Sequence, residues 1–455
     1  MIDRKVDILS VTMMSSGRDA EMVIPILYYC KRFLGLSTFS GTGVDARYLI
    51  DRLNPRMLLV PNSMGDNNYI KAVRYAVKRG IPVLSLMSEG DLRESNVEKA
   101  FWGLNRDKVL YEDLNLQWTE TIKDLVLKHF PELKGKIGVS GGVGFDRYKI
   151  YDFMTREEFA NKYKKDYKRI VCYAGWGFDQ LYGDYFELEK GRYTECYGDG
   201  QIKSFREDRL HMNEILHSLI KNNPDTLFIL KYHPGIRKIK EFTEFIGLEQ
   251  YENVVEIKKG GSIADFINVS DFLMAYESTA ALESWLLGKQ TFLINPSNSD
   301  FPRSEVSQGS PIFKTYEECQ KAMDSFYKTG AIKGFKEKEA IRRKIIKSRI
   351  GWDDGKNHAR VGEILGTFFG KNRDRSTKDP SSLEAMKNCM VHLIFEKMRW
   401  ATRPQFISKI PIRKLKVLKY CQDIFSYRDL ERLRAKYHPY LDRFYKREGI
   451  RAKNG

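Results

Sequence analysis

The amino-acid sequence predicts an α/β protein with two doubly wound parallel sheets and a basic helical extension. Short apolar runs alternate with segments of helical spacing through most of the chain, a pattern typical of parallel sheets joined by crossover helices. A glycine-rich stretch at 141–144 interrupts this alternation, and the strand-like runs stop near residue 370. We therefore expect an N-terminal domain at 1–148, a second domain at 149–370 and a helical tail at 371–455.

The elements of the first expected domain follow from apolar runs and capping residues. Pro25 lies late enough in the first helical segment to kink it, Asp66 is placed to cap the third, and Gly80 is placed to end it. The region between residue 92 and Phe130 is expected to be mainly helical. The expected strands are 6–12, 57–61, 81–87 and 136–142, and the expected helices are 18–33, 46–53 and 67–79.

The second expected domain repeats the same pattern. A polar, aromatic and glycine-rich stretch at 179–205 interrupts it, and we expect a long loop or lid there. The helix at 278–288 ends at Gly288, a favourable C-terminal residue. The expected strands are 169–174, 226–232, 253–259, 271–276 and 290–296, and the other expected helices are 207–223, 239–248 and 262–270.

The net charge of +17 is distributed unevenly along the chain. Residues 371–455 hold 22 Lys and Arg against nine Asp and Glu, a net of +13, which leaves +4 for the rest. Basic residues interleaved with apolar and aromatic ones are typical of helices that lie on an anionic bilayer. We expect 371–455 to bind an anionic membrane surface. The alternatives are a solvated extension and a helical cap on the protein's own body. A nucleic-acid-binding tail is a further alternative, which the absence of a recognised nucleic-acid motif disfavours.

Composition and motif content argue against several classes of protein. No apolar run reaches 18 residues, and the N-terminus lacks the apolar core of a signal peptide. Six cysteines without CxxC spacing indicate reduced thiols. The expected location is therefore the cytoplasm, peripheral at the inner face of the cytoplasmic membrane.

No metal and no cofactor are predicted. The sequence has no GxxxxGK[ST] motif, which argues against a P-loop enzyme. His211 and His217 are six residues apart, a spacing that does not suit a helical metal pair, and Asp353-Asp354 is typical of a turn before a helix.

Two short signatures of the second domain predict a phosphate pocket. His233-Pro234 follow one strand-like run, and Ser278-Thr279 open a helix directly after another. In such sheets ligands bind in the crevice at the carboxyl ends of the strands. A His there can donate to phosphate oxygens, and a helix N-terminus favours an anion. A structural loop His and simple helix capping are the alternatives.

Three further residues complete the predicted nucleotide site. Glu283 lies one turn into the helix after Ser278 and is suited to accept hydrogen bonds from a ribose hydroxyl pair. Lys231 precedes the His-Pro pair and can offset phosphate charge. Gly175 lies in the glycine-containing loop after the strand at 169–174.

An acidic loop of the first domain supplies the predicted catalytic base. Ser88-Glu89-Gly90-Asp91 follow the strand at 81–87. A carboxylate at a strand end is suited to general-base work on a sugar hydroxyl, so Glu89 and Asp91 are the candidates beside the catalytic candidate His233. A simple turn or helix cap is the alternative.

Together these residues resemble the GT-B glycosyltransferases of bacterial surface-polysaccharide synthesis, a group that includes capsule Kdo transferases, sialyltransferases and CDP-glycerol polymerases. Ser88-Glu89-Gly90-Asp91 resembles their acidic motif but lacks the doubled acid before glycine. His233-Pro234 resembles their His-Pro motif, and Ser278-Thr279 their Ser/Thr motif. The stretch 141–148, GGVGFDRY, resembles the segment that begins their second domain, with Val143 and Gly144 where that segment has Pro and Arg.

The resemblance implies two Rossmann-like domains facing a cleft, with the donor in the second and the acceptor in the first. It implies a metal-independent glycosyltransferase that moves a sugar from a nucleotide-activated, CMP-linked donor to a growing or lipid-linked surface glycan such as capsule or lipopolysaccharide. In that family the acidic residue is the base and the other motifs bind the nucleotide phosphate. The alternatives are polyol-phosphate transfer from CDP-glycerol and a sugar-nucleotide 2-epimerase.

Overall fold

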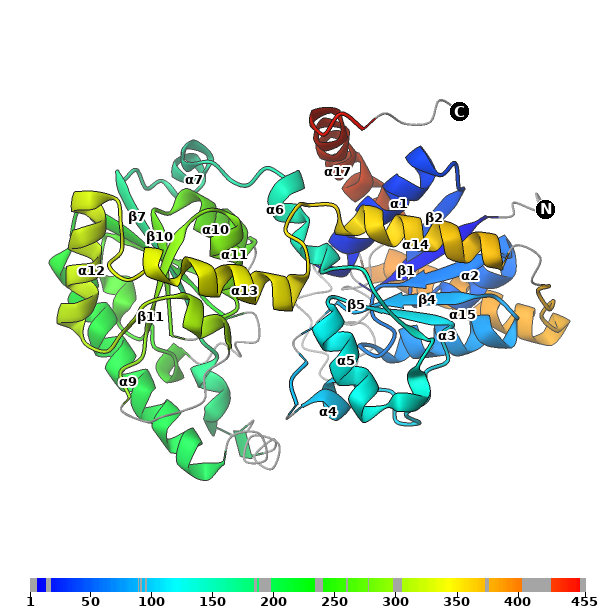
Figure 1. Ribbon diagram of the computed structural model, residues 1–455, viewed down its shortest axis with the longest axis horizontal. Coiled ribbons are helices and arrows are strands. Elements are labelled where there is room, and N and C mark those ends of the chain that lie inside the picture. The colour runs from blue at the N-terminus through cyan, green and yellow to red at the C-terminus, as the bar shows by residue number, and fades with distance from the viewer. Residues whose placement is uncertain are drawn as a thin grey trace. The chain divides into compact units, whose positions relative to one another are not determined.

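Figure 1 shows the computed structural model of the 455-residue chain. Its contacts divide the chain into two compact units: the first combines Met1–Tyr151 with Lys347–Gly455, and the second is Asp152–Ile346. The structure describes residues 6–13, 18–88, 90, 92–94, 96–183, 186–187, 198–233, 240–258, 261–276, 278–297, 305–372, 376–402 and 427–450.

The first unit is built on a six-stranded parallel sheet of order β2-β1-β3-β4-β5-β6. Buried aliphatic side chains from both faces of the sheet pack against the surrounding helices, as the doubly wound arrangement requires. The strands are β1 Ile8–Thr12, β2 Thr38–Thr42, β3 Met57–Val60, β4 Val83–Leu86, β5 Leu114–Gln117 and β6 Ile137–Val139.

Two of these strands, β2 and β5, were not predicted from the sequence. β2 reads TFSGT and has a single large apolar residue. β5 reads LNLQ, and its polar residues are buried: Asn115 donates from Nδ2 to Ser85 Oγ at 2.8 Å, and Gln117 donates to Asn115. Hydrogen bonds between buried side chains let polar residues occupy a central strand, so the apolar pattern is lost there.

The second unit holds another six-stranded parallel sheet, of order β12-β11-β10-β7-β8-β9. Both predicted doubly wound sheets are thus confirmed. The strands are β7 Arg169–Ala174, β8 Thr226–Lys231, β9 Val254–Ile257, β10 Phe272–Ala275, β11 Gln290–Ile294 and β12 Ile312–Phe313.

The helices cover both faces of each sheet in Figure 1. Two expectations for the second unit fail. The predicted loop 179–205 includes the start of a long helix, α9, and the predicted helix 239–248 is replaced in its described part by two 3-10 turns, Lys240–Phe242 and Leu248–Gln250. The helices are α1 Arg18–Phe33, α2 Ala46–Leu53, α3 Asn67–Lys78, α4 Val97–Trp102, α5 Glu120–His129, α6 Arg147–Ile150, α7 Arg156–Tyr163, α9 Asp199–Asn222, α10 Ile263–Val269, α11 Ala280–Leu286, α12 Tyr316–Thr329, α13 Glu339–Ile350, α14 Asn357–Lys371, α15 Ser382–Thr402 and α17 Tyr427–Arg447.

The chain returns to the first unit earlier than the expected boundary at residue 370. Helix α14 packs along α1, with Val361 and Leu365 in the core of the first sheet. Helix α17 then packs on α1 and β2 through Tyr437, Leu441 and Phe444. Helices α14 and α17 therefore belong to the N-terminal body, because they bury apolar side chains that the first 151 residues leave uncovered.

A buried carboxylate, Asp146, ties this return to the first unit. Its Oδ2 accepts from the backbone amide of His358 at 2.7 Å and lies 2.8 Å from His358 Nδ1. Its Oδ1 accepts from Asn357 Nδ2 at 2.8 Å and from the Asn357 amide at 3.1 Å. His358 Nε2 lies 2.6 Å from the hydroxyl of Tyr445 on α17. Asp146 belongs to the stretch GGVGFDRY, and Gly141 is required there because a Cβ would lie 1.9 Å from Asn357 Oδ1.

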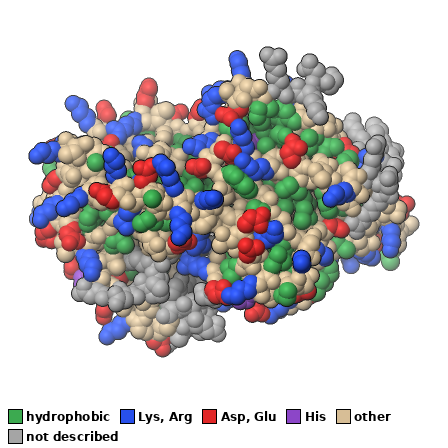
Figure 2. All heavy atoms as spheres, in the orientation of Figure 1, with side chains coloured by type: hydrophobic (Ala, Val, Ile, Leu, Met, Phe, Trp, Pro, Cys, Tyr) green, Lys and Arg blue, Asp and Glu red, His purple; other side chains and the backbone are tan. Residues whose placement is uncertain are grey.

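The surface carries mixed charge on the face shown in Figure 2, where Lys and Arg side chains are interspersed with Asp and Glu. This mixture agrees with the small net charge of residues 1–370. None of the helices among the described residues is both long enough and apolar enough to cross a bilayer.

Replacing Asp146 with Ala should lower the free energy of unfolding of the first unit by about 3–5 kcal/mol, because the buried partners on Asn357 and His358 lose their acceptor together. Urea denaturation followed by tryptophan fluorescence measures this change. Glu98→Gln, at an exposed ion pair with Lys108, is the control and should leave the curve unchanged. Equal curves for the two variants would contradict the assigned role of Asp146.

Candidate functional site

The strand order of the second unit places a switch point between β7 and β10. The chain runs from β7 outward to β8 and β9, then returns to β10 on the other side of β7. Ala174, at the end of β7, pairs with Lys231 at the end of β8 and with Ala275 at the end of β10. The three strands therefore end at one level, and such a switch point is the ligand crevice of open α/β sheets.

The loop after β7 is held close to the end of β8. Gly175 donates its amide to Lys231 O at 2.8 Å. A Cβ on Gly175 would lie 2.8 Å from the Phe245 ring and 3.1 Å from Lys231 O, so a side chain cannot be added without moving this packing. A Cβ on Gly177 would lie 3.5 Å from His233 Nδ1, which places the GWG loop directly beside the predicted histidine.

His233 follows β8 and reaches the surface at this edge. Desolvation by the surrounding protein lowers its pKa from the ordinary value of 6.5, so the free protein presents a neutral imidazole at pH 7. A neutral ring donates one N–H to a phosphate oxygen. Burial also lowers the pKa of Lys231, whose side chain is half-buried. Pro234 lies outside the described residues.

The loop after β10 carries the predicted Ser/Thr pair. Ser278 Oγ accepts from the Ala280 amide at 3.1 Å, so this hydroxyl caps the start of α11. Thr279 is exposed at the helix N-cap and makes no capping hydrogen bond through its side chain. Glu283 lies half-buried one turn into α11, a helix of seven residues. The structure therefore brings Lys231, His233, Gly175 and the Ser/Thr pair to adjacent strand ends.

An aromatic cluster joins the loops on the two sides of the switch point. Trp176, after β7, packs against Phe178 and Phe205 with ring centroids 4.8 Å apart in each pair. Tyr276, after β10, lies 5.7 Å from Trp176 and donates its hydroxyl to the buried Asp208 on α9. These contacts fix the spacing between the two loops, and packed aromatic pairs of this kind restrict their motion.

A buried acid beside the Gly175 loop escaped the sequence prediction. Glu244 Oε1 accepts from the Trp176 amide at 2.8 Å, and Oε2 has no hydrogen-bond partner among the described residues. Burial raises the pKa of Glu244 to about 8, and Asp179 adds to this shift. The carboxyl is therefore protonated at neutral pH. Glu244 lies in the segment 239–248, which we expected to be a helix. An acidic residue in such a helix is predicted to face solvent, so the sequence did not indicate a buried acid.

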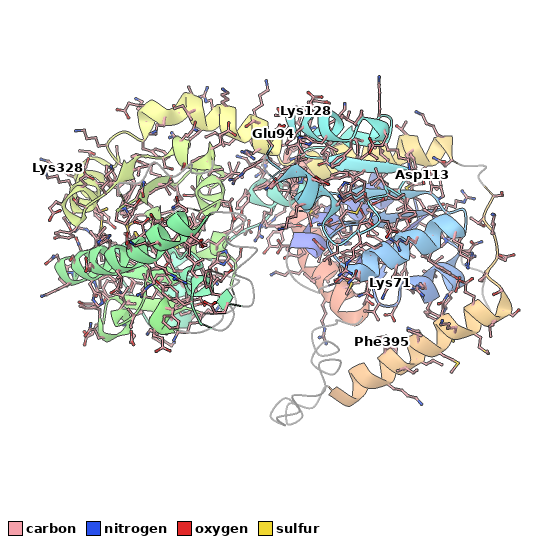
Figure 3. All side chains as sticks on the ribbon, turned by 90° about the horizontal axis from the view of Figure 1, so that it is seen from below. Lys71, Glu94, Asp113, Lys128, Lys328 and Phe395 are labelled. Atoms are coloured by element: carbon pink, nitrogen blue, oxygen red, sulfur yellow. The ribbon has the colours of Figure 1, made fainter. Side chains whose placement is uncertain are left out.

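The acidic loop of the first unit follows β4, as predicted, but Glu89 and Asp91 lie outside the described residues. Their neighbours are fixed: Ser88 accepts at Oγ from Asn62 Nδ2 at 2.9 Å, and a Cβ on Gly90 would meet the Trp118 ring at 2.4 Å. Downstream, Glu94 lies 2.7 Å from Lys128 Nζ on α5 (Figure 3).

A cavity of about 840 Å³ lies elsewhere, between α1 and α17 of the first unit. Lys31, Arg32 and Arg434 line it together with His438 and Asp442, and none of the predicted site residues does. Size alone therefore does not identify the site, and the strand-end geometry of the second unit remains the stronger indication.

Solved structures share the fold. A Listeria monocytogenes protein named as a UDP-N-acetylglucosamine 2-epimerase superposes with a TM-score of 0.54 at 13% identity, covering 83% of this chain and 98% of its own. The S. aureus MnaA structure with UDP gives 0.51 at 14%, covering 80% and 97%. The wall teichoic acid polymerase TagF gives 0.51 at 12%, covering 81% and 90%. No protein-family model and no curated protein matches the sequence. This chain has the two-domain Rossmann-like GT-B fold.

Glu244 should make stability depend on pH. Its folded-state pKa of about 8 lies above the ordinary 4.5, so the stability present below pH 4.5 is lost as pH rises through 8. Glu244→Gln keeps an acceptor for the Trp176 amide and cannot ionise. The wild type should lose about 2–3 kcal/mol relative to this variant between pH 6 and pH 9. Urea denaturation at each pH measures the difference, and parallel pH profiles would show that Glu244 is not buried as a neutral acid.

Proposed function

We propose that this protein is a glycosyltransferase that uses a nucleotide-activated sugar, with the nucleotide bound at the β8, β7 and β10 strand ends of the second unit. The observation that carries this proposal is that Ala174 pairs with both Lys231 and Ala275, so that three strands end at one level beside the switch point. The structural neighbours named for UDP-N-acetylglucosamine and for teichoic acid synthesis support a nucleotide-sugar or nucleotide-polyol substrate.

The proposed reaction breaks the bond between the sugar's anomeric carbon and the nucleotide phosphate oxygen. The electron pair leaves with the phosphate, whose developing charge the Lys231 ammonium and the His233 N–H stabilise. An acceptor hydroxyl forms the new glycosidic bond, and its proton passes to a carboxylate of the acidic loop, Glu89 or Asp91. We propose a CMP-linked donor and a growing or lipid-linked surface glycan as acceptor, because the sequence signatures resemble those of CMP-sugar transferases.

The second candidate is a sugar-nucleotide 2-epimerase, which is favoured by the fold shared with the Listeria monocytogenes protein over 83% of this chain. Transfer of a polyol phosphate from CDP-glycerol is the related alternative, because TagF shares the fold. The candidate reactions differ in whether they require an acceptor substrate. An epimerase converts its nucleotide sugar without an acceptor, whereas both transferases release a nucleotide only when an acceptor is present.

We also propose that α15 docks on an anionic membrane, in place of the whole tail expected from the sequence. Its contacts with the first unit run along one i, i+4 row: Glu384, Asn388, His392 and Glu396. Five large apolar side chains lie on the opposite side within an arc of roughly 100° and are more than half exposed. They are Leu383, Met386, Met390, Leu393 and Ile394.

The hydrogen-bonding side chains of α15 thus face the protein, while these five apolar side chains face outward. The sequence after it, 403–426, carries six Lys and Arg against one Asp, with Ile, Leu and Phe between them. An apolar helix face followed in the sequence by such a stretch suits a bilayer with anionic headgroups. Helix α17 takes no part in this surface because Leu441 and Phe444 are buried against the first unit.

A nucleotide panel tests the proposed site. CMP should raise the melting temperature of the wild type and should fail to do so for His233→Ala, because the variant lacks the N–H donor to phosphate. Bound phosphate should also raise the His233 pKa, so CMP affinity should increase as pH falls from 8 to 6.

His211→Ala is the matched control, since His211 is exposed on α9, and it should respond to CMP like the wild type. Stabilisation by UDP but not CMP, with conversion of UDP-N-acetylglucosamine in the absence of acceptor, would replace the transferase with the epimerase. Equal CMP responses in His233→Ala and the wild type would remove His233 from the site.

Vesicle sedimentation tests the membrane surface. The wild type should bind vesicles containing phosphatidylserine more strongly than pure phosphatidylcholine vesicles. The triple variant Leu383→Ser, Leu393→Ser, Ile394→Ser should lose most of this binding, because three exposed apolar side chains no longer enter the interface.

The control is Leu104→Ser with Leu210→Ser, which removes two side chains that are about half exposed elsewhere. This control should bind vesicles like the wild type. Wild-type binding by the triple variant would exclude α15 as the docking surface. A concentration-dependent dimer that the triple variant abolishes, with no vesicle binding, would assign the face to a second copy of the chain.

A further inference from the structure

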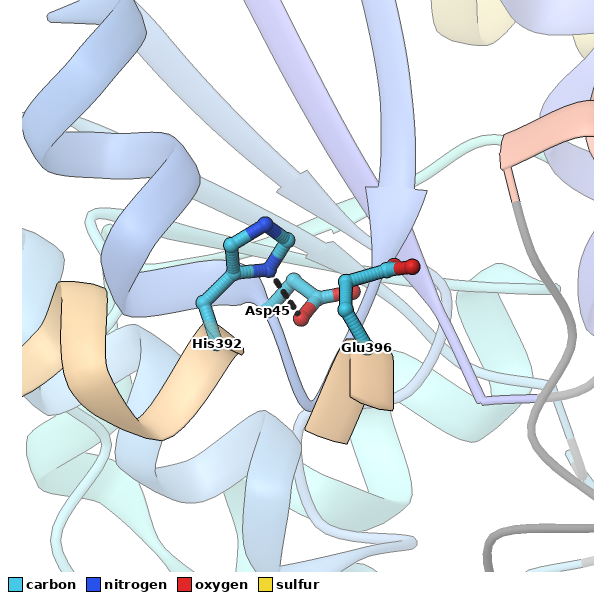
Figure 4. A group of neighbouring side chains, drawn as sticks. All are labelled: Asp45, His392 and Glu396. Carbon is cyan, nitrogen blue, oxygen red and sulfur yellow. Dashed lines mark hydrogen bonds and ion pairs between the residues drawn. The ribbon is translucent and has the colours of Figure 1, made fainter. Parts of the chain in front are cut away.

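Three potential metal ligands converge where α15 meets the first unit (Figure 4). Asp45 lies in the loop between β2 and α2, while His392 and Glu396 project from successive turns of α15. One ligand atom from each residue lies within 4.8 Å of the other two. This is the one group of three or more such ligands found among the described residues.

The ligands come from rigid elements and are oriented by neighbours. Asp45 is nearly buried, and its Oδ2 accepts from Thr42 Oγ1 at 2.8 Å, which leaves Oδ1 facing His392 Nδ1 at 2.9 Å. The His392 ring stacks on Tyr48, with centroids 4.0 Å apart and planes 6° apart. Supporting contacts of this kind set the orientation of metal ligands.

The spacing suits a small tetrahedral ion. Ligand atoms bound to Zn²⁺ at 2.0–2.1 Å lie about 3.3 Å apart, so the Asp45–His392 pair must open by a few tenths of an ångström. Glu396 has a flexible side chain and is exposed, so it can move inward and also leaves a path for a hydrated ion. A neutral imidazole and two carboxylates neutralise a divalent cation, and water would complete the fourth position.

The carboxylates of Asp45 and Glu396 both lie beside the His392 imidazole. A divalent cation held by all three residues would offset the mutual repulsion of these two like charges, whose oxygens lie within 4.8 Å of each other. The imidazole ligand favours zinc over magnesium and calcium, which prefer all-oxygen sites.

We propose that Asp45, His392 and Glu396 form a structural site for a divalent transition-metal ion, with zinc as the best match. The ion joins α15 to the loop after β2, across 347 residues of sequence. It fixes the row of polar contacts that also contains Asn388, whose Nδ2 donates to Asp51 Oδ2 at 2.7 Å. The proposal depends on neither the sugar substrate nor the vesicle binding, since its ligands lie in the first unit alone.

Equilibrium dialysis of the full-length, chelator-treated protein against Zn²⁺ and then Mg²⁺, with the bound metal quantified, tests the site. One equivalent of Zn²⁺ should bind, and Mg²⁺ should not compete. His392→Ala and Glu396→Gln should each weaken Zn²⁺ binding about tenfold or more, since altering even supporting residues costs at least that much. Zn²⁺ should also slow proteolysis within α15 in the wild type and not in the two variants.

His129→Ala is the matched control, because His129 Nε2 lies 3.0 Å from Glu94 in a comparable surface His–carboxylate pair. It should bind Zn²⁺ like the wild type, and circular dichroism should show that all variants are folded. Absence of bound Zn²⁺, equal binding by Glu396→Gln and the wild type, or Mg²⁺ binding as tight as Zn²⁺ binding would each overturn the proposal.

Discussion

One buried carboxylate determines how this chain is assembled. Asp146 lies near the end of the N-terminal stretch of the first unit, and its two oxygens accept from both backbone amides and contact both side chains of Asn357 and His358. Through His358 the network reaches Tyr445, so a single site joins three segments that lie far apart in sequence. Burying a carboxylate is costly unless its acceptor sites are filled, and that cost makes the arrangement specific, because other registers of α14 would leave Asp146 unsatisfied.

In the second unit, the strand ends and the loops that follow them are held in fixed positions by their neighbours. The parallel register ends β8, β7 and β10 at one level. Gly175 permits the close approach of one loop to β8. The aromatic cluster around Trp176 and Tyr276 fixes the spacing between the two flanking loops. Glu244 adds a neutral acid under the same loop. The polar groups at the strand ends are thus held in place by buried residues that no sequence motif indicated. Supporting contacts of this kind keep a binding site in one geometry.

The sequence was sufficient for the two parallel sheets and for the strand-end positions of His233 and Ser278, because apolar runs and their punctuation are local signals. It was insufficient wherever the decisive partner is distant. Buried Asn115 and Gln117 concealed β5, because Asn115 is satisfied by Ser85 on the neighbouring strand β4 and Gln117 by Asn115 itself. The i, i+4 pair of His392 and Glu396 can be read from the sequence, but Asp45 joins them only through the fold. Likewise, nothing local shows that α14 buries Val361 against the first sheet.

The division of the chain also bears on the order in which it folds during synthesis. The second unit is one continuous stretch, Asp152–Ile346, inserted into a first unit whose parts lie on either side of it. Every strand of the second sheet has therefore left the ribosome before α14 and α17 exist. Domains generally fold as units during translation, so the second unit can mature while the first still exposes the apolar surface of α1. The N-terminal body is consequently completed last, and it is the part of the nascent protein that most needs protection from aggregation.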